Sequence, residues 1–119
     1  PVLQWAREKC LDIMIVETAL SPGTDEHVAP QEENMDMASQ ALAGQGSRPT
    51  RTWVFNTLKR LFPYVYAPVT QPAHEEFPCD WRQSQLTGKS HIRAVFIASL
   101  RPLGSPLLLD RLPERQKPV

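Results

Sequence analysis

The chain has 119 residues and a formal net charge of zero. A chain of this length buries roughly two thirds of its unfolded surface and forms one core, which excludes a large multidomain protein. The zero net charge argues against a general nucleic-acid binder, since that role normally needs a strong basic excess.

The proline content, the cysteine content and the hydropathy restrict the loop content, membrane insertion and compartment that we expect. The twelve prolines are about double the usual share of ~5% and predict many loops. No apolar run approaches the roughly eighteen residues that span a bilayer, and nothing resembles a signal peptide. Two cysteines, Cys10 and Cys79, are too few for a disulfide framework in this length of chain. We therefore expect free thiols and an intracellular, reducing compartment, with an organelle such as the mitochondrion included.

The charges lie in blocks along the chain. Residues 10–47 contain acidic side chains and no Lys or Arg, whereas the next four charges, Arg48, Arg51, Lys59 and Arg60, are all positive. The simplest interpretation is that the blocks face each other or water. The alternative is that a basic face docks on an acidic partner.

The N-terminal part predicts a helix, a strand and a second helix. Residues 2–9 have apolar residues along one side of a short helix. Residues 11–16, LDIMIV, form a nearly continuous apolar run with branched side chains, which favours a strand covered on both faces, as in a parallel sheet. After turn residues, residues 31–43 show helical spacing and end at Gly44. Residues 44–49, GQGSRP, indicate a flexible connector.

Residues 51–66 hold the densest apolar clustering of the chain. Val54, Leu58 and Leu61 fall at helical spacing, with Thr50 or Thr52 available as the N-terminal cap. Pro63 ends the helix, and residues 64–66 favour a strand. Prolines then punctuate residues 67–80, residues 81–90 are polar and irregular, and residues 92–100 predict a second firm strand.

The last residues differ from the rest. Residues 101–119 carry four prolines around Leu107, Leu108 and Leu109, and a segment of this composition does not fold alone. These leucines therefore either pack back on the body or anchor the chain to a partner. We predict one small α/β domain over residues 1–100, built from a small mixed sheet with helices, and an extended proline-rich tail over residues 101–119.

Candidate chemistry is weak. Residues 87–90, TGKS, end like a phosphate-binding loop, but Gln83 stands where that motif needs glycine and no strand leads into it. His74, Cys79 and His91 match no compact metal site in their spacing. We expect no cofactor and no metal.

Four stretches taken in order resemble the C-terminal half of spermidine synthase-like and class I methyltransferase-like proteins. They are LDIMIVETALSPG at residues 11–23, MDMASQALAGQGS at 35–47, WVFNTLKRLFPYVYAPV at 53–69 and RAVFIASLRPL at 93–103. The family has an apolar strand, a helix ending in glycine, and a helix closing in an L-F-P-x-V type sequence that enters the antiparallel hairpin finishing the sheet. The resemblance implies a truncated version of that fold.

The differences between this chain and the family pattern bear on the expected activity. The family's nucleoside-binding glycine loop would precede Pro1. The family also places two acids after the apolar strand, and its first carboxylate takes a proton from the attacking amine. Glu17 stands at the matching position, and the second acid is missing. The resemblance therefore implies a remnant of the fold without its cofactor site.

The sequence supports two main hypotheses of function and a third, weaker one. We favour a non-catalytic accessory subunit of a larger assembly over an enzyme, and we expect its proline-rich tail and charged faces to bind other protein subunits. The residues assigned to docking are Leu107, Leu108, Leu109, Arg48, Arg51, Lys59 and Arg60. The alternative is a transferase fragment in which Glu17 is the general base and another chain supplies the cofactor site. The third is an RNA-contacting subunit that adds Trp53, Tyr64 or Tyr66 for stacking.

Overall fold

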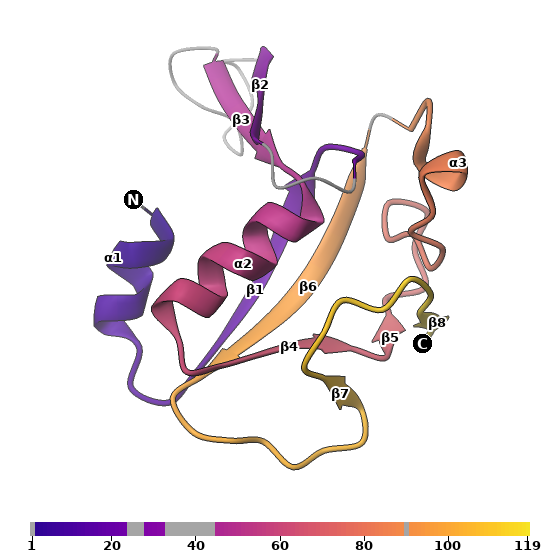
Figure 1. The fold of residues 1–119 in the computed structure, drawn as a ribbon. Coiled ribbons are helices and arrows are strands. Elements are labelled where there is room, and N and C mark those ends of the chain that lie inside the picture. The colour runs from indigo at the N-terminus through magenta and orange to yellow at the C-terminus, as the bar shows by residue number, and fades with distance from the viewer. Residues whose placement is uncertain (1, 24–27, 33–44, 90) are drawn as a thin grey trace.

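The central element is β6 (Ile92–Ser99), because it pairs with a strand on each side. The computed structural model describes residues 2–23, 28–32, 45–89 and 91–119, and in these the main sheet has the order β1-β6-β4-β7 (Figure 1). The other three strands are β1 (Ile13–Leu20), β4 (Tyr64–Pro68) and β7 (Leu108–Leu109). The predicted strand at residues 92–100 is confirmed.

All neighbouring strands of the main sheet run antiparallel, so the main sheet is antiparallel and the prediction of a mixed sheet is wrong for it. β6 runs antiparallel to β1, with Ile13 opposite Ser99 and Leu20 opposite Ile92. It also runs antiparallel to β4, with Tyr64 opposite Ser99. β1 and β4 are therefore parallel to each other with an antiparallel strand between them. β7 adds an antiparallel strand at the far side of β4.

Two short ribbons lie outside the main sheet. β2 (Val28–Glu32) pairs antiparallel with β3 (Gln45–Pro49). β5 (Thr70–Gln71) pairs in parallel with β8 (Lys117–Pro118). The second ribbon joins the C-terminal segment to the middle of the chain.

The helix α2 (Arg51–Leu61) covers one face of the main sheet (Figure 1). Thr50 caps it, since its hydroxyl accepts the N–H of Trp53 at 3.2 Å, and Phe62, in extended conformation, ends it directly before Pro63. Val54, Phe55 and Leu58 are buried on its inner side. The predicted helix and its cap are confirmed, because helical spacing, cap and proline all mark the same boundaries.

The core lies between α2 and the sheet. On β6, Ile92, Ala94, Phe96 and Ala98 are buried at alternate positions, which the two-residue period of a strand explains. They contact a cluster that includes Leu58 of α2. The other buried apolar residues of the cluster are Leu20, Val54, Phe55, Phe62, Val65, Ala67, Trp81 and Leu86, the last from the short helix α3 (Gln83–Leu86).

The predicted N-terminal helix is confirmed as α1 (Val2–Lys9), which lies beside α2 at the β1 side of the sheet (Figure 1). The Nε of Arg7 donates to the carbonyl of Leu61 at 2.9 Å, and its guanidinium lies 5.2 Å from the ring centroid of Phe62. A cation at the last carbonyls of a helix is favourable because the helix dipole is negative there. α1 has no buried residue.

Three other expectations differ from the structure. The strand predicted at residues 11–16 is β1, but it pairs antiparallel and lies at the edge of the described sheet with Ile15 68% exposed, so it is not covered on both faces. In the helix predicted at residues 31–43, Gln31 and Glu32 belong to β2, and residues 33–43 lie outside the described residues. The predicted connector is largely the strand β3, since pairing with β2 overrides the flexible composition.

The proline-rich segment packs back on the body, the first of the two alternatives. Leu112 contacts the core cluster, and Gln116 is 8% exposed. The Gln116 side chain accepts the indole N–H of Trp81 at 2.7 Å and donates to the carbonyl of Pro68 at 2.6 Å. None of the described helices is long and apolar enough to cross a membrane.

Candidate interaction surface

Exposed apolar side chains gather near the N-terminus. Of the large hydrophobic residues that are exposed in the described part of the chain, Val2, Trp5, Leu11, Ile13 and Ile15 all precede residue 16. We call these five residues the α1–β1 surface. Trp5 is 62% exposed and Leu11 94% exposed. Such a concentration is typical of a contact surface, whereas apolar residues scattered singly are normal on any protein.

The surface flanks β1 on both faces of the sheet. Met14 and Val16 point to the α2 side, where they pack against the core cluster. Because successive side chains of a strand point to opposite faces, Ile13 and Ile15 lie on the other face. Val2 and Trp5 belong to α1, which stands on the α2 side. The edge of β1 therefore has exposed apolar groups above and below it.

A groove runs along β1 on the α2 side. It has a volume of about 680 Å³ and is bounded by the first turn of α1, the middle of β1 and the side of α2 that carries Trp53, Val54 and Thr57. Val2, Leu3, Val16, Trp53 and Leu61 supply apolar lining. Gln4, Thr57 and Arg60 add polar lining, so the groove is a mainly apolar depression that continues the α1–β1 surface into the helix layer.

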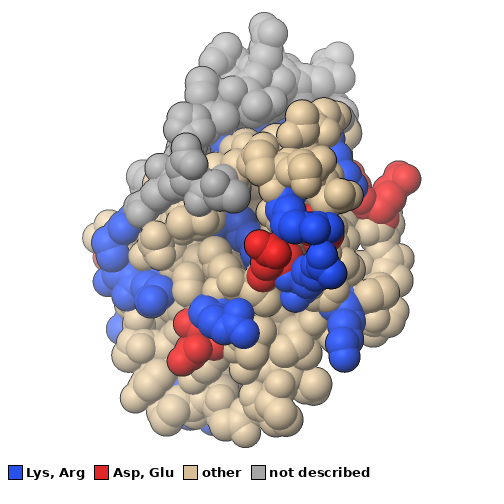
Figure 2. All heavy atoms as spheres, turned by 45° about the vertical axis from the view of Figure 1, so that its right-hand side comes forward, with Lys and Arg blue, Asp and Glu red and all other residues tan. Residues whose placement is uncertain are grey.

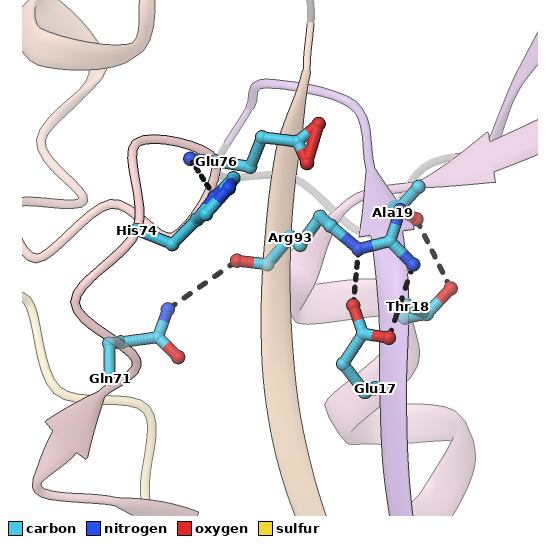
Figure 3. A network of polar contacts seen from close by, with 7 residues as sticks. All are labelled: Glu17, Thr18, Ala19, Gln71, His74, Glu76 and Arg93. Carbon is cyan, nitrogen blue, oxygen red and sulfur yellow. Dashed lines mark hydrogen bonds and ion pairs between the residues drawn. The ribbon is translucent and has the colours of Figure 1, made fainter.

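Glu17, the candidate general base, is bound to an arginine across the sheet (Figure 3). Both carboxylate oxygens accept from Arg93: the Nε bonds one, and the Nη2 lies 3.1 Å from the other. This contact raises the pKa of Arg93 above its usual value, because the bond to Glu17 favours the charged guanidinium. Protonation of Glu17 would break this forked ion pair, so the carboxylate is poorly placed as a base.

Arg93 also connects its strand to Gln71 through a hydrogen bond of its backbone carbonyl. The carbonyl of Arg93 accepts from the Nε2 of Gln71 at 3.4 Å, and that nitrogen also donates to the carbonyl of Pro78 at 3.2 Å. Figure 3 shows Gln71 on one side of β6 and Glu17 on the other, with Arg93 between them. The geometry is that of a structural cross-link between β1, β6 and the segment after β5.

Arg51 is buried at 8% exposure. Its Nη1 donates to the carbonyl of Pro113 at 2.7 Å, and its guanidinium lies 4.2 Å from the ring centroid of Trp81. Burial lowers the pKa of Arg51 to about 9, because desolvation disfavours the charged form. This predicted docking residue therefore binds the C-terminal segment of its own chain.

The other three basic docking residues are less buried. Arg48 lies on β3, opposite Ala29 of β2. Lys59 and Arg60 are exposed at the end of α2, with the Lys59 ammonium 5.6 Å from the ring centroid of Phe55. Arg60 donates to the hydroxyl of Thr57 at 3.1 Å.

Charges of both signs mix on the face shown in Figure 2. Close ion pairs between described residues include Arg82 with Asp80 at 2.6 Å and Arg101 with Asp12 at 2.8 Å. A surface of alternating sign does not provide the continuous basic field that a nucleic acid needs.

The aromatic residues of the RNA hypothesis are not brought together. Trp53 lines the groove on the α2 side, whereas Tyr64 lies on β4 and is 39% exposed. Tyr66 is buried, and its hydroxyl accepts the N–H of Leu103 at 3.0 Å. These rings do not form one stacking platform.

The three leucines of the C-terminal segment, Leu107 to Leu109, differ in burial. Leu108 and Leu109 form β7 and are half-buried, opposite Pro68 and Ala67 of β4. Leu107 is 63% exposed. Only Leu107 of this group offers a largely open apolar side chain.

The remaining motifs form no metal cluster among the described residues, although Gly88, Lys89 and His91 line a shallow hollow with Glu75 and Glu76. The TGKS segment follows the short helix α3, and Gly88 has φ +85° in an exposed turn. His74 accepts the N–H of Glu76 on its Nδ1 at 3.1 Å. Within residues 2–23, 28–32, 45–89 and 91–119, no three His, Cys, Asp or Glu side chains are grouped to hold a metal.

The sequence contained a signal for the α1–β1 surface. Val2 and Trp5 lie outside the apolar stripe of Leu3, Ala6 and Cys10, so one helix carries apolar residues on more than its inner side. Residues 13–16 are apolar at consecutive positions, which a one-sided edge strand does not need. Both patterns indicate more apolar surface than one small core can bury.

Comparisons with models of protein families, with curated proteins and with solved structures found no match to this chain. The methyltransferase-like resemblance and the docking role stay predictions.

Proposed function

We propose that the chain is a non-catalytic accessory subunit of a larger protein assembly and that the α1–β1 surface is its principal contact. The observation that carries the proposal is the concentration of exposed apolar side chains before residue 16, Trp5 and Leu11 foremost. Burying such side chains stabilises a complex by about 25 cal/mol per Å² of apolar area removed from water. In the isolated chain the exposed part of these side chains stays in water and gains no such stabilisation.

The state of the candidate catalytic groups supports the same proposal. Glu17 is occupied by Arg93, and His74 lies exposed in a turn with its Nδ1 accepting a backbone N–H. Catalysis by a nucleophile and a base needs the two within hydrogen-bond reach of each other. The free thiols of Cys10 and Cys79 agree with the intracellular, reducing compartment that we propose for the assembly.

The contribution of the C-terminal segment to docking is smaller in this proposal than the sequence suggested. Arg51, Leu108 and Leu109 are engaged within the chain, which leaves Leu107 with the exposed cations Lys59 and Arg60 as secondary contacts.

Two matched substitutions test which surface docks. Trp5 and Leu107 are 62% and 63% exposed, so a lysine at either site removes a comparable open apolar side chain without opening the core. We expect Trp5→Lys to abolish comigration of the tagged chain with a large complex on a native gel from its own cells, and Leu107→Lys to retain it. Circular dichroism and thermal unfolding serve as the folding control for both variants.

The opposite pattern would move the docking site to the C-terminal segment. If the wild-type chain migrated alone at its own mass, the accessory-subunit proposal would be wrong.

A second candidate is the transferase fragment, because the strand order favours it. The antiparallel β4–β6 hairpin after α2 is the arrangement that the methyltransferase-like resemblance implies for the end of the sheet. In that reading another chain supplies the nucleoside site and Glu17 accepts the amine proton. Glu17→Gln in a reconstituted pair should then abolish transfer to the amine, whereas unchanged transfer would exclude Glu17 as the base.

A further inference from the structure

We propose that the free edge of β1 accepts one extended, apolar segment of another polypeptide as an additional strand. The inference rests on the proposed function, because it specifies how the α1–β1 surface is covered. Strand addition is a common mode of peptide recognition in which main-chain hydrogen bonds supply affinity and side-chain pockets supply specificity.

The hydrogen-bond pattern of β1 identifies the groups that would pair. The N–H of Leu100 donates to the carbonyl of Asp12 at 2.9 Å, so Asp12 and Leu100 form a hydrogen-bonded pair of the antiparallel ladder. Hydrogen-bonded and non-hydrogen-bonded pairs alternate along such a ladder. The N–H and C=O groups that point away from β6 therefore belong to the odd-numbered residues Ile13, Ile15, Glu17 and Ala19.

The chain itself uses the next group along this edge. The N–H of Ser21 donates to the carbonyl of Pro49 at 2.9 Å, which confirms that odd-numbered residues face outward here. Among the described residues, no strand pairs with Ile13 to Ala19 on that side. Four consecutive outward positions are enough for a short added strand.

β1 also lacks the features that protect edge strands. Natural edges carry lysine, proline or a bulge, or are very short, because an open apolar edge recruits other strands. β1 has eight residues without lysine, proline or glycine, and its one charge, Glu17, is neutralised by Arg93. An edge of this kind is stable in a cell when another strand covers it.

The surroundings define the chemistry of the added strand. On the α2 side its side chains would enter the groove lined by Val2, Leu3 and Trp53, and on the opposite face they would lie beside Ile13 and Ile15. Both neighbourhoods are mainly apolar, and Glu17 is paired with Arg93, although Arg60 and Thr57 also line the groove on the α2 side. The segment is therefore apolar at consecutive positions and uncharged in its centre.

The position of α1 favours a single segment over a second copy of this chain. α1 stands in the helix layer beside α2, and its first turn shares the groove with the middle of β1 (Figure 1). Helices pack 8–10 Å apart, about twice the ~4.8 Å spacing of strands. A second copy paired through β1 would bring its own α1 and α2 into the space that α1 occupies, whereas a bare strand brings no helix.

The test measures amide hydrogen exchange by NMR on the full chain. The probe is an acetylated and amidated peptide with the sequence of Ile92–Ser99, because this strand already pairs with the other edge of β1. In the free chain we expect fast exchange at Ile13, Ile15, Glu17 and Ala19 and slow exchange at the residues between them. With the peptide at roughly ten times its Kd, the odd-numbered amides should exchange about tenfold more slowly, as linkage requires.

Two controls separate strand pairing from apolar adsorption. The same peptide methylated on every central backbone nitrogen keeps its side chains but has no central N–H donor on either edge, and it should give no protection. Ile15→Pro removes an outward N–H without removing a bond to β6, and it should prevent peptide binding, whereas Ile15→Val should retain it. The methylated peptide carries the test even if Ile15→Pro does not fold.

Three results would overturn the inference: odd-numbered amides already protected in the dilute chain, equal binding of the methylated peptide, or no binding of the unmodified one. Concentration-dependent protection with a dimer in sedimentation would assign the edge to a second copy and would also overturn it. Each of these leaves the Trp5→Lys result intact, so failure of strand addition is distinguishable from failure of the accessory-subunit proposal.

Discussion

Arg51 shows how a residue's role depends on partners that are distant in the sequence. It is the first residue of α2 and stands in a block of like charges, so sequence alone favours a solvated or docking role. Its partners, Trp81 and Pro113, come from two other segments. Because neutral pH lies below its pKa of about 9, the guanidinium stays charged and its contact with Trp81 is a cation–π interaction. No local pattern could have revealed this contact.

Replacing Arg51 should destabilise the fold. Arg51→Met keeps an apolar stem but leaves the buried carbonyl of Pro113 without its donor. We expect the free energy of unfolding in urea to fall by about 1–3 kcal/mol, the range for an unsatisfied buried polar group. The exposed Arg111 is the control, and Arg111→Met should change stability by no more than about 0.5 kcal/mol. Equal stability of Arg51→Met and the wild type would show that the contact contributes nothing.

The carboxyl group of Asp80 gives the clearest pH dependence of folding stability. Its hydrogen bonds with Arg82 lower the pKa of the carboxyl to about 2, from 3.8. Because the folded pKa lies below the unfolded one, the stabilisation is complete above pH 3.8 and disappears as pH falls through about 2. A carboxyl NMR titration should show this low pKa, and Arg82→Gln should raise it toward 3.8. Arg82→Lys should give an intermediate value because lysine lacks the forked geometry.

At the scale of single elements, local patterns worked where several of them agreed. α1 and α2 were predicted because helical spacing coincided with a proline or a cap, and β6 was predicted because its apolar centre favours a strand. The prediction failed at Gln31 and Glu32 and at the connector, where pairing between β2 and β3 decides the structure. Strand pairing joins distant residues, so composition within a short window does not determine it.

The cap of α2 supports a specific prediction. Thr50 is 1% exposed, and its hydroxyl accepts the N–H of Trp53. Thr50→Ala should lower the free energy of unfolding by about 1 kcal/mol, the usual effect of losing a cap. Thr50→Ser keeps the capping hydroxyl, so the free energy of unfolding should fall distinctly less. A small loss remains because removal of the methyl group leaves a void. Equal losses for the two variants in thermal or urea unfolding would assign the effect to packing.

For the whole molecule, the mixed α/β class was predictable and the sheet order was not. The run at residues 11–16 correctly predicts a strand of apolar composition. It does not predict that β6 pairs with only one edge of that strand. The exposed apolar residues of the α1–β1 surface were likewise missed, since exposure of Trp5 and Ile15 depends on which elements pack around them. The leucines of the C-terminal segment show the converse, because β4 pairs with two of them.

The most direct test of the account compares hydrogen exchange by mass spectrometry in the isolated chain and in the assembly purified with it. The account predicts slower exchange in the assembly over residues 2–19, which carry the α1–β1 surface, and little change over residues 101–112. Unchanged exchange over residues 2–19 together with protection of residues 101–112 would contradict it and would assign docking to the C-terminal segment.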